Sequence, residues 1–278
     1  MDILPMSGAL GAEITGVDLR AEPSNSVSSD IHEAFLRYHV LYFPGQHLSP
    51  RQELRFARIF GEVDTYPFLE GLPETPEVIE ILKTETDTRN FGGSWHSDTT
   101  YMECPALGSV LSALEVPDFG GDTLFANMEL AYESLSDGLK QALDGLVAVN
   151  SSEGPYRGGR AAAMATLDGM KGAYNIRAET FESEHPAVRT HPETGRKSIY
   201  VDALHTPRFK DMTEEESRPV LDYLFRHAAR PEFTCRFAWA PGSLAVWDNR
   251  CAQHNALNDY HGHRRVMHRV TVEGDRPV

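Results

Sequence analysis

Apolar and polar positions follow two different periods near the start of the chain. Apolar side chains recur at helical spacing over residues 31–38, and a short apolar run then covers 40–43 before a Pro-Gly pair. The first pattern predicts a helix, and the second predicts a buried strand that ends in a turn. Ser49 begins a capping-box pattern with proline at the next position. This pattern predicts a second helix that runs to about Gly61.

The middle and the C-terminal part of the chain contain most of the strand-like runs. Helical patterns are predicted within 128–146 and, from a capping box, after Thr213. The runs that predict strands are 78–82, 107–114, 123–125, a run from Ser198, and then 233–239, 243–247 and 265–272. Helices and strands do not alternate regularly, and the sequence has no GxGxxG or Walker motif. We therefore predict a mainly β protein with flanking helices, of the α+β class.

Two segments depart from this regular pattern. Residues 84–94 are polar and end in glycines, which predicts a loop that covers a site as a lid. Residues 151–190 show no sustained period, and such a long connection predicts a functional insert. No stretch rich in Ser, Gly or Pro divides the 278 residues, so we predict one domain over 1–278.

Composition and charge narrow the class of protein. The 26 Lys and Arg against 41 Asp and Glu give a formal net charge of −15, which disfavours binding to nucleic acid or to an anionic membrane. No apolar stretch is long enough to span a bilayer, and the first residues do not form a secretory signal. Three well-separated cysteines, Cys104, Cys235 and Cys251, fit a reducing compartment. These features predict a cytoplasmic globular protein.

Candidate chemistry comes from histidines that stand two residues before a carboxylate. The chain has 12 histidines and two such pairs, His96 with Asp98 and His191 with Glu193, which is about the number expected by chance. The second pair lies between Pro and Gly residues and is typical of a solvated turn. The first pair follows a glycine-rich loop, where we predict the start of a strand. Alternation would then place both side chains on one face.

A third ligand and an anion site are predicted towards the C-terminus. His254 follows the strand predicted at 243–247 and would complete a set of two histidines and one carboxylate, which suits non-haem Fe(II) oxygen chemistry. On the last strand, Arg265 and Arg269 share one face. They lie in solvent at a sheet edge, pair with acidic side chains, or line a cavity for an anion. On the residues alone, a zinc hydrolase and a non-catalytic anion-binding jelly roll also stay open.

Four sequence blocks occur in order along nearly the whole chain. They are Trp95-His96-Ser97-Asp98, Gly120-Gly121-Asp122-Thr123-Leu124, Trp247-Asp248-Asn249-Arg250 with His254, and Arg264-Arg265-Val266-Met267-His268-Arg269. Together they resemble the taurine dioxygenase (TauD/TfdA) family of Fe(II)- and 2-oxoglutarate-dependent oxygenases. The resemblance implies a double-stranded β-helix, or jelly-roll, core with helices outside it. It also implies that His96, Asp98 and His254 bind Fe(II), with O2 as co-reactant.

The resemblance further implies what the enzyme binds. Thr123 and Arg265 would hold the distal carboxylate of 2-oxoglutarate, and Arg269 would anchor the substrate. Tyr66 stands where taurine dioxygenases have a substrate-contacting histidine, so taurine itself is not expected. With Tyr66, the aromatic residues that suit a larger apolar substrate are Phe68, Phe91 and Tyr156.

The activity implied is hydroxylation of a small anionic organic substrate, with succinate and CO2 as co-products. A sulfonate or sulfate ester is the main expectation, and an aryloxyalkanoate or other carboxylate is the alternative, because an arginine anchor suits all of these anions. Family resemblance also implies a homo-oligomer, either a dimer or a tetramer.

Overall fold

Two β-sheets form the centre of the computed structural model, which describes residues 1–153, 163, 166–170, 172–173 and 180–278. The larger sheet has the strand order β1-β2-β3-β14-β6-β16-β4, with β5 also paired to β16, and the smaller sheet has the order β13-β7-β15. The strands of the larger sheet are β1 (Asp2–Pro5), β2 (Ala12–Thr15), β3 (Val40–Phe43), β4 (Val63–Asp64), β5 (Val78–Lys83), β6 (Gly108–Glu115), β14 (Leu244–Asp248) and β16 (Arg265–Val272). Those of the smaller sheet are β7 (Thr123–Asn127), β13 (Thr234–Phe237) and β15 (Ala252–Ala256).

The two sheets pack face to face. Phe125 of β7 and Trp247 of β14 have ring centroids 5.6 Å apart, and both side chains are buried in one cluster with Leu111 and Met267 of the larger sheet. All pairs in the two sheets are antiparallel except β2 with β3. Two facing, mainly antiparallel sheets are the architecture of a jelly roll, as predicted.

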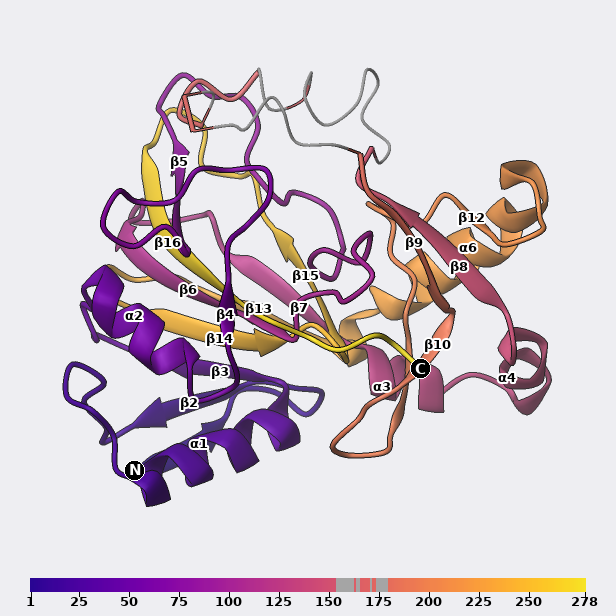
Figure 1. The fold of residues 1–278 in the computed structure, drawn as a ribbon, viewed down its shortest axis with the longest axis horizontal. Coiled ribbons are helices and arrows are strands. Elements are labelled where there is room, and N and C mark those ends of the chain that lie inside the picture. The colour runs from indigo at the N-terminus through magenta and orange to yellow at the C-terminus, as the bar shows by residue number, and fades with distance from the viewer. Residues whose placement is uncertain (154–162, 164–165, 171, 174–179) are drawn as a thin grey trace.

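Two helices cover the outer face of the larger sheet. The helix α1 (Asn25–Tyr38) buries Ile31, Ala34 and Phe35 and packs on β3 and β14, and α2 (Pro50–Ala57) packs on β6 and β16 (Figure 1). The predicted capping box is present, because the Ser49 backbone N–H donates to Gln52 Oε1 at 2.8 Å. The α-helix ends at Ala57, earlier than the predicted end near Gly61, and tighter i→i+3 turns follow.

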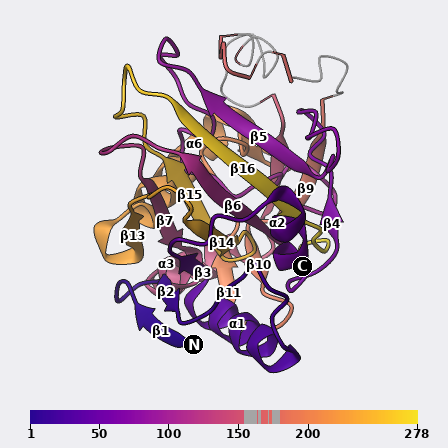
Figure 2. The ribbon, with the colours of Figure 1, turned by 90° about the vertical axis from the view of Figure 1, so that its left-hand side faces the viewer.

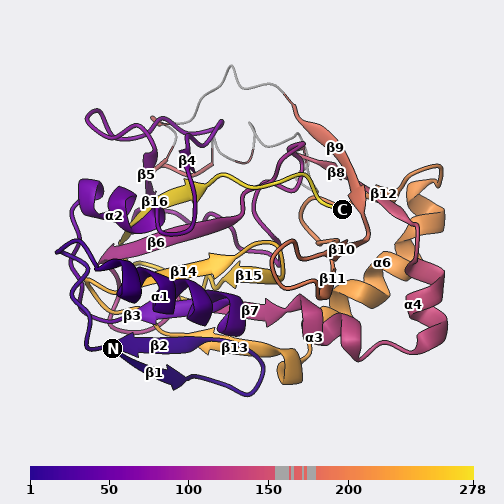
Figure 3. The same cartoon turned by 60° about the horizontal axis from the view of Figure 1, so that its bottom comes forward.

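A second group of helices and short strands lies at the other end of the molecule (Figure 1). Figure 3 shows that β7 leads directly into α3 (Met128–Glu133), with α4 (Asp137–Leu143) and α6 (Glu214–Ala228) at the same end. The capping box of α6 is formed as predicted, with the Thr213 N–H donating to Glu216 Oε2 at 2.8 Å. The short elements of this region are β8 (Val147–Ser151), β9 (Glu182–Pro186), β10 (Val188–Thr190), β11 (Lys197–Ile199), β12 (Arg208–Phe209) and the 3-10 helix η1 (Pro231–Phe233).

The structure corrects two expectations from the sequence. His96 and Asp98 do not begin a strand: His96 forms one isolated bridge to His254, and Asp98 lies in a turn. A solvated edge for the two arginines is also wrong, because β16 lies between β6 on one side and β5 and β4 on the other (Figure 2). The expected insert at 151–190 falls partly outside the described residues, as does Tyr156. No helix in the described ranges is long and apolar enough to cross a membrane.

Candidate active site

His96, Asp98 and His254 meet between the two sheets. The backbone N–H groups of His96 and His254 donate to each other's carbonyl oxygens, at 3.1 and 2.9 Å, so the segment before Asp98 is tied to β15. Asp98 Oδ1 lies 3.6 Å from His96 Nε2 and 3.8 Å from His254 Nε2. All three side chains are buried. The structure thus brings the three predicted ligands to one point.

The hydrogen bonds around these side chains leave their metal-facing atoms available. His96 Nδ1 lies 2.7 Å from the Ser94 carbonyl oxygen, which accepts the Nδ1–H and leaves the Nε2 lone pair facing Asp98. Ser109 Oγ donates to Asp98 Oδ2 at 2.8 Å, so Oδ1 is the oxygen that faces the imidazoles. A single ion with bonds of roughly 2.0–2.2 Å can reach all three atoms after small side-chain shifts. These residues fit an Fe(II) ion.

Burial sets the charges in this group. It lowers the pKa of His96 and of His254, so both imidazoles are neutral and keep a lone pair. Burial opposes ionisation of Asp98, but the Arg269 guanidinium, together with the hydrogen bond from Ser109, outweighs it and holds the pKa of Asp98 well below its usual range. Neutral imidazoles and an ionised carboxylate are the forms that bind a metal ion.

The turn between β14 and β15 holds the segment that carries Asp98. Asn249 Oδ1 accepts the backbone N–H of Asp98 at 3.2 Å and the indole N–H of Trp247 at 2.9 Å. Ser97 Oγ donates to the Ala252 carbonyl oxygen at 3.0 Å. Asn249 belongs to the block Trp247-Asp248-Asn249-Arg250, but the role of its side chain could not be predicted because it depends on the fold placing Asn249 beside Asp98.

Thr123 and Arg265 line one side of the group. They share a cavity with His96, His254 and Trp247. The Trp239 indole N–H donates to Thr123 Oγ1 at 3.0 Å, so the threonine O–H is free to donate to a bound anion. Arg265 is buried, and its Nε and Nη2 have no hydrogen-bond partner among the described residues. A carboxylate would satisfy these groups.

Arg269 and Tyr66 line the other side, in a cavity that shares His96 and Arg269 with the first. Arg269 Nη2 lies 3.0 Å from Asp98 Oδ1, and its guanidinium lies 5.4 Å from the centroid of the Tyr66 ring. The Tyr66 hydroxyl lies 3.4 Å from that of Tyr101. Phe91 also lines this cavity, and Phe68 packs edge-on against Tyr66 behind it. This side therefore has one cation and an aromatic wall.

His205 also lines this second cavity, although no sequence motif distinguishes it among the 12 histidines. Its Nδ1 lies 3.3 Å from Asp202 Oδ1 and 3.1 Å from Thr100 Oγ1, and no hydrogen bond of its Nε2 occurs within the described ranges. The ring stands nearly perpendicular to that of His96, with centroids 5.7 Å apart. His205 is thus held at Nδ1 in the wall of the cavity.

Gly92 lies against the His96 imidazole. Its φ of +76° is a left-handed conformation that favours glycine, and a Cβ at this position would lie 3.4 Å from His96 Cε1 and 3.8 Å from His96 Nε2. A side chain here would therefore extend over the metal-facing nitrogen.

The second histidine–carboxylate pair has a different environment from the one predicted. Residues 192–194 form a turn, but His191 is only 1% exposed, and its Nε2 lies 3.0 Å from Asp248 Oδ2. Glu193 contacts Arg250 at 2.6 Å. The expectation of a solvated histidine was wrong, because Asp248 and Arg250 reach this turn from the β14–β15 connection.

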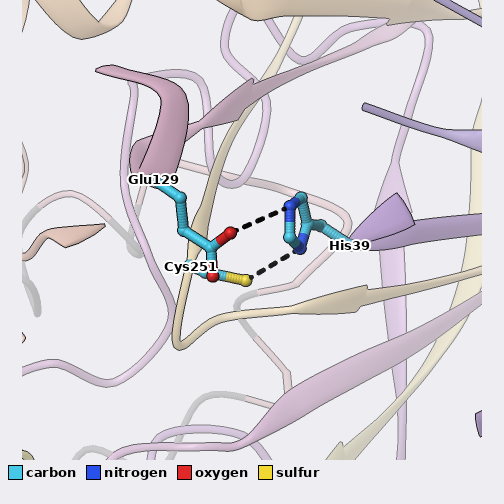
Figure 4. Close-up of side chains that lie close together, drawn as sticks. All are labelled: His39, Glu129 and Cys251. Carbon is cyan, nitrogen blue, oxygen red and sulfur yellow. Dashed lines mark hydrogen bonds and ion pairs between the residues drawn. The ribbon is translucent and has the colours of Figure 1, made fainter. Parts of the chain in front are cut away.

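A buried group of His39, Glu129 and Cys251 lies apart from these cavities (Figure 4). Cys251 Sγ is 3.2 Å from His39 Nδ1, whereas Glu129 Oε2 is 3.4 Å from His39 Nε2. Figure 4 shows Glu129 and Cys251 next to each other on one side of the His39 imidazole. One ligand atom from each of the three side chains lies within 4.8 Å of the other two. Neither carboxylate oxygen of Glu129 forms a hydrogen bond with a described residue, and its Oε2 lies 3.0 Å from Arg196 Nη1. We assign this group no part in the reaction.

Comparison with known proteins gives a consistent result. The family described as "Taurine catabolism dioxygenase TauD, TfdA family" matches residues 2–271. An alkylsulfatase of Acinetobacter baylyi is 35% identical over 277 residues, which cover 99% of this chain and 86% of the relative. An (S)-phenoxypropionate/alpha-ketoglutarate-dioxygenase of Sphingobium herbicidovorans is 34% identical, with 99% and 95% covered. The crystal structure of a taurine dioxygenase from Burkholderia xenovorans superposes with a TM-score of 0.83 at 35% identity, covering 100% of this chain and 90% of that one.

Proposed function

The chain belongs to the TauD/TfdA family of Fe(II)- and 2-oxoglutarate-dependent dioxygenases, and from this we propose that it hydroxylates a small organic sulfate ester or sulfonate. In this proposal His96, Asp98 and His254 hold the iron. Thr123 and Arg265 hold the distal carboxylate of 2-oxoglutarate. The observation that best supports a small anionic substrate is Arg269, a buried cation beside the three ligands and next to an aromatic wall.

The chemistry supplied by bound iron, 2-oxoglutarate and O2 is hydroxylation of a C–H bond, with succinate and CO2 as co-products. The protein's part is to orient the substrate. Arg269 would bind the anionic head so that the carbon next to it lies nearest the three ligands. When that carbon carries a sulfate ester oxygen, its new hydroxyl loses a proton, a C=O bond forms, and the C–O bond to sulfate breaks. The products are an aldehyde and sulfate, or sulfite from a sulfonate.

The second cavity favours an apolar substrate body over an amine. Among the described residues that line it, the only carboxylate is Asp98, which we assign to the iron. An ammonium group such as that of taurine would therefore lack an anionic partner there. Tyr66 and Phe91 offer aromatic contact to an alkyl or aryl group instead. This supports a substrate larger and more apolar than taurine.

An aryloxyalkanoate or other carboxylate is the alternative substrate. The (S)-phenoxypropionate dioxygenase among the relatives supports it. Arginine binds carboxylates and sulfates alike, so Arg269 does not separate the two classes. In the carboxylate case, hydroxylation next to the ether oxygen would release a phenol.

A substrate panel tests the proposal directly. Purified protein with Fe(II), 2-oxoglutarate and O2 would be incubated with hexyl sulfate, hexanesulfonate, taurine and 2-phenoxypropionate, and succinate would be measured with sulfate, sulfite and phenol. We expect most succinate and an equal amount of sulfate with hexyl sulfate, and little product with taurine. Phenol as the main product would select the alternative. Equal succinate with and without every compound would contradict a substrate of either class.

We also propose that the chain acts as one domain in which loop 84–94 covers the iron site, and that it works in the cytoplasm as a homo-oligomer. Three free cysteines support a reducing compartment, and Phe91 and Gly92 of the loop contribute to both cavities. The exposed apolar side chains Ile3 and Leu4 on the edge strand β1 support an oligomer. Light scattering after size-exclusion chromatography tests the subunit number.

A further inference from the structure

Lys83 is a buried lysine without an anionic partner. It ends β5, its side chain is only 4% exposed, and its Nζ makes no hydrogen bond to any residue that the structure describes. The Nζ lies 4.4 Å from the centroid of the Tyr260 ring, which is itself buried. A cation–π contact of this kind replaces only part of the hydration that a buried ammonium loses.

The sheet register places this lysine directly opposite Arg265. In the antiparallel pair of β5 and β16, Lys83 and Arg265 are Cα partners, so their side chains lie on the same face. Both residues line one small cavity, together with Tyr260. Two like charges directly opposite each other destabilise a sheet. Burial adds to this cost, and it lowers the pKa of Lys83 and of Arg265.

Asp87 favours the charged form of Lys83 and Asp122 that of Arg265, but neither carboxylate forms an ion pair with these cations among the described residues. Asp87 accepts hydrogen bonds from the Thr84 N–H and hydroxyl, both at 2.8 Å, and from the backbone N–H groups of Asp168 and Gly169 at 2.6 and 3.2 Å. It forms no ion pair with Lys83 within 4.0 Å in the described part of the chain. The Asp87 carboxylate therefore stabilises the loop, and Lys83 and Arg265 still lack an ion-paired anion among the described residues.

We propose that Lys83 is a second cationic ligand for the distal carboxylate of 2-oxoglutarate, shared with Arg265. The proposal rests on the cosubstrate site assigned above and adds to it a residue on the neighbouring strand. One carboxylate has two oxygens and can accept from a guanidinium and an ammonium together. Binding of the cosubstrate would then satisfy the free nitrogens of both residues at once.

Calorimetric titration of Mn(II)-loaded protein without O2 separates this role from a structural one. The titrants are 2-oxoglutarate and 2-oxopentanoate, which has the same number of carbons but a methyl group in place of the distal carboxylate. The proteins are wild type, Lys83→Met, Lys83→Gln and Arg265→Met, with Lys197→Met as a control at an exposed lysine. The melting temperature of each metal-free protein is also measured.

We expect Lys83→Met to weaken 2-oxoglutarate binding about 10- to 100-fold, the effect of losing one charge-assisted hydrogen bond, and to change 2-oxopentanoate binding less than twofold. The metal-free Lys83→Met protein should melt at a higher temperature than wild type, because an unpaired buried cation is removed. Lys83→Gln should weaken 2-oxoglutarate binding in the same selective way.

Two results would overturn the proposal. In the first, 2-oxoglutarate affinity is unchanged in both Lys83 variants while Arg265→Met loses it. In the second, both oxoacids weaken equally, which would make Lys83 a structural residue. If Arg265→Met also binds 2-oxoglutarate normally, or if wild type binds neither acid, the failure lies in the proposed function itself.

Discussion

Replacing Asn249 by alanine tests whether the β14–β15 turn positions the metal ligand Asp98. The side chain is fully buried, and its Oδ1 accepts two N–H groups, those of the Asp98 backbone and the Trp247 indole. Asn249→Ala leaves both buried donors unsatisfied, at roughly 1–3 kcal/mol each before relaxation. We expect a loss of about 2–4 kcal/mol in the free energy of unfolding. For a chain of this size that loss corresponds to roughly 5–15 °C in Tm.

The effect on metal binding is what distinguishes positioning from general stability. Loss of a group that orients a metal ligand costs about 10- to 100-fold in metal affinity. Asn127 gives a matched control, because it is also buried and its side chain also makes two hydrogen bonds, to Leu130 N–H at 2.9 Å and to the Ala9 carbonyl oxygen at 2.7 Å.

Mn(II) affinity, measured by electron paramagnetic resonance, and thermal unfolding would be compared for Asn249→Ala, Asn127→Ala and wild type. We expect both variants to melt earlier and only Asn249→Ala to lose metal affinity. Equal metal affinity in the two variants would refute the positioning argument, whatever their stability.

Three further predictions concern an iron ligand, a residue of the substrate cavity and the buried Glu129. His254→Ala should abolish the weak visible absorption of the protein–Fe(II)–2-oxoglutarate complex under nitrogen, because two ligands remain; an unchanged band would contradict the ligand assignment. His205→Phe should raise the KM for the organic substrate about tenfold and leave 2-oxoglutarate binding unchanged, since His205 lines only the cavity assigned to the substrate, and a change confined to the cosubstrate would count against this. Burial raises the pKa of Glu129 to about 7, above its pKa in the unfolded chain. The neutral carboxyl therefore contributes stability that is fully present below the unfolded pKa and is lost as the pH rises through 7. Thermal unfolding should show Glu129→Gln gaining stability over wild type at pH 8.5 relative to pH 5, and a pH-independent difference would argue otherwise.

Local patterns were sufficient for much of the fold. The strand predicted at 40–43 is β3, and both capping boxes were identified from four residues each, because caps and short apolar runs depend on neighbours in sequence. The strand β15 was not predicted. Its sequence, Ala-Gln-His-Asn-Ala, has no apolar alternation, and it becomes a strand through its pairing with β7.

In the site, too, the features that depend on distant residues could not be predicted. The sequence blocks named the three ligands and the arginines, and the structure brings these residues together. The sequence could not show that a turn begins at Asp98, because the shape of this segment depends on hydrogen bonds to residues about 150 positions away. Lys83 gave no signal either, since one lysine at the end of a strand is typical of a surface. Its proposed role follows only from the sheet register, which places it opposite Arg265.

The two cavities that share His96 and Arg269 are built from different kinds of chain segment, and this has a consequence for redesign. The cavity with Thr123 and Arg265 is lined mostly by paired strands, whereas Tyr66, Leu204 and His205 of the other cavity lie outside any strand. Loop positions accept new side chains with less disturbance of the sheets. A library confined to these three positions should therefore change which compounds are oxidised while the oxidising machinery stays intact, so that one scaffold could yield catalysts for many compounds.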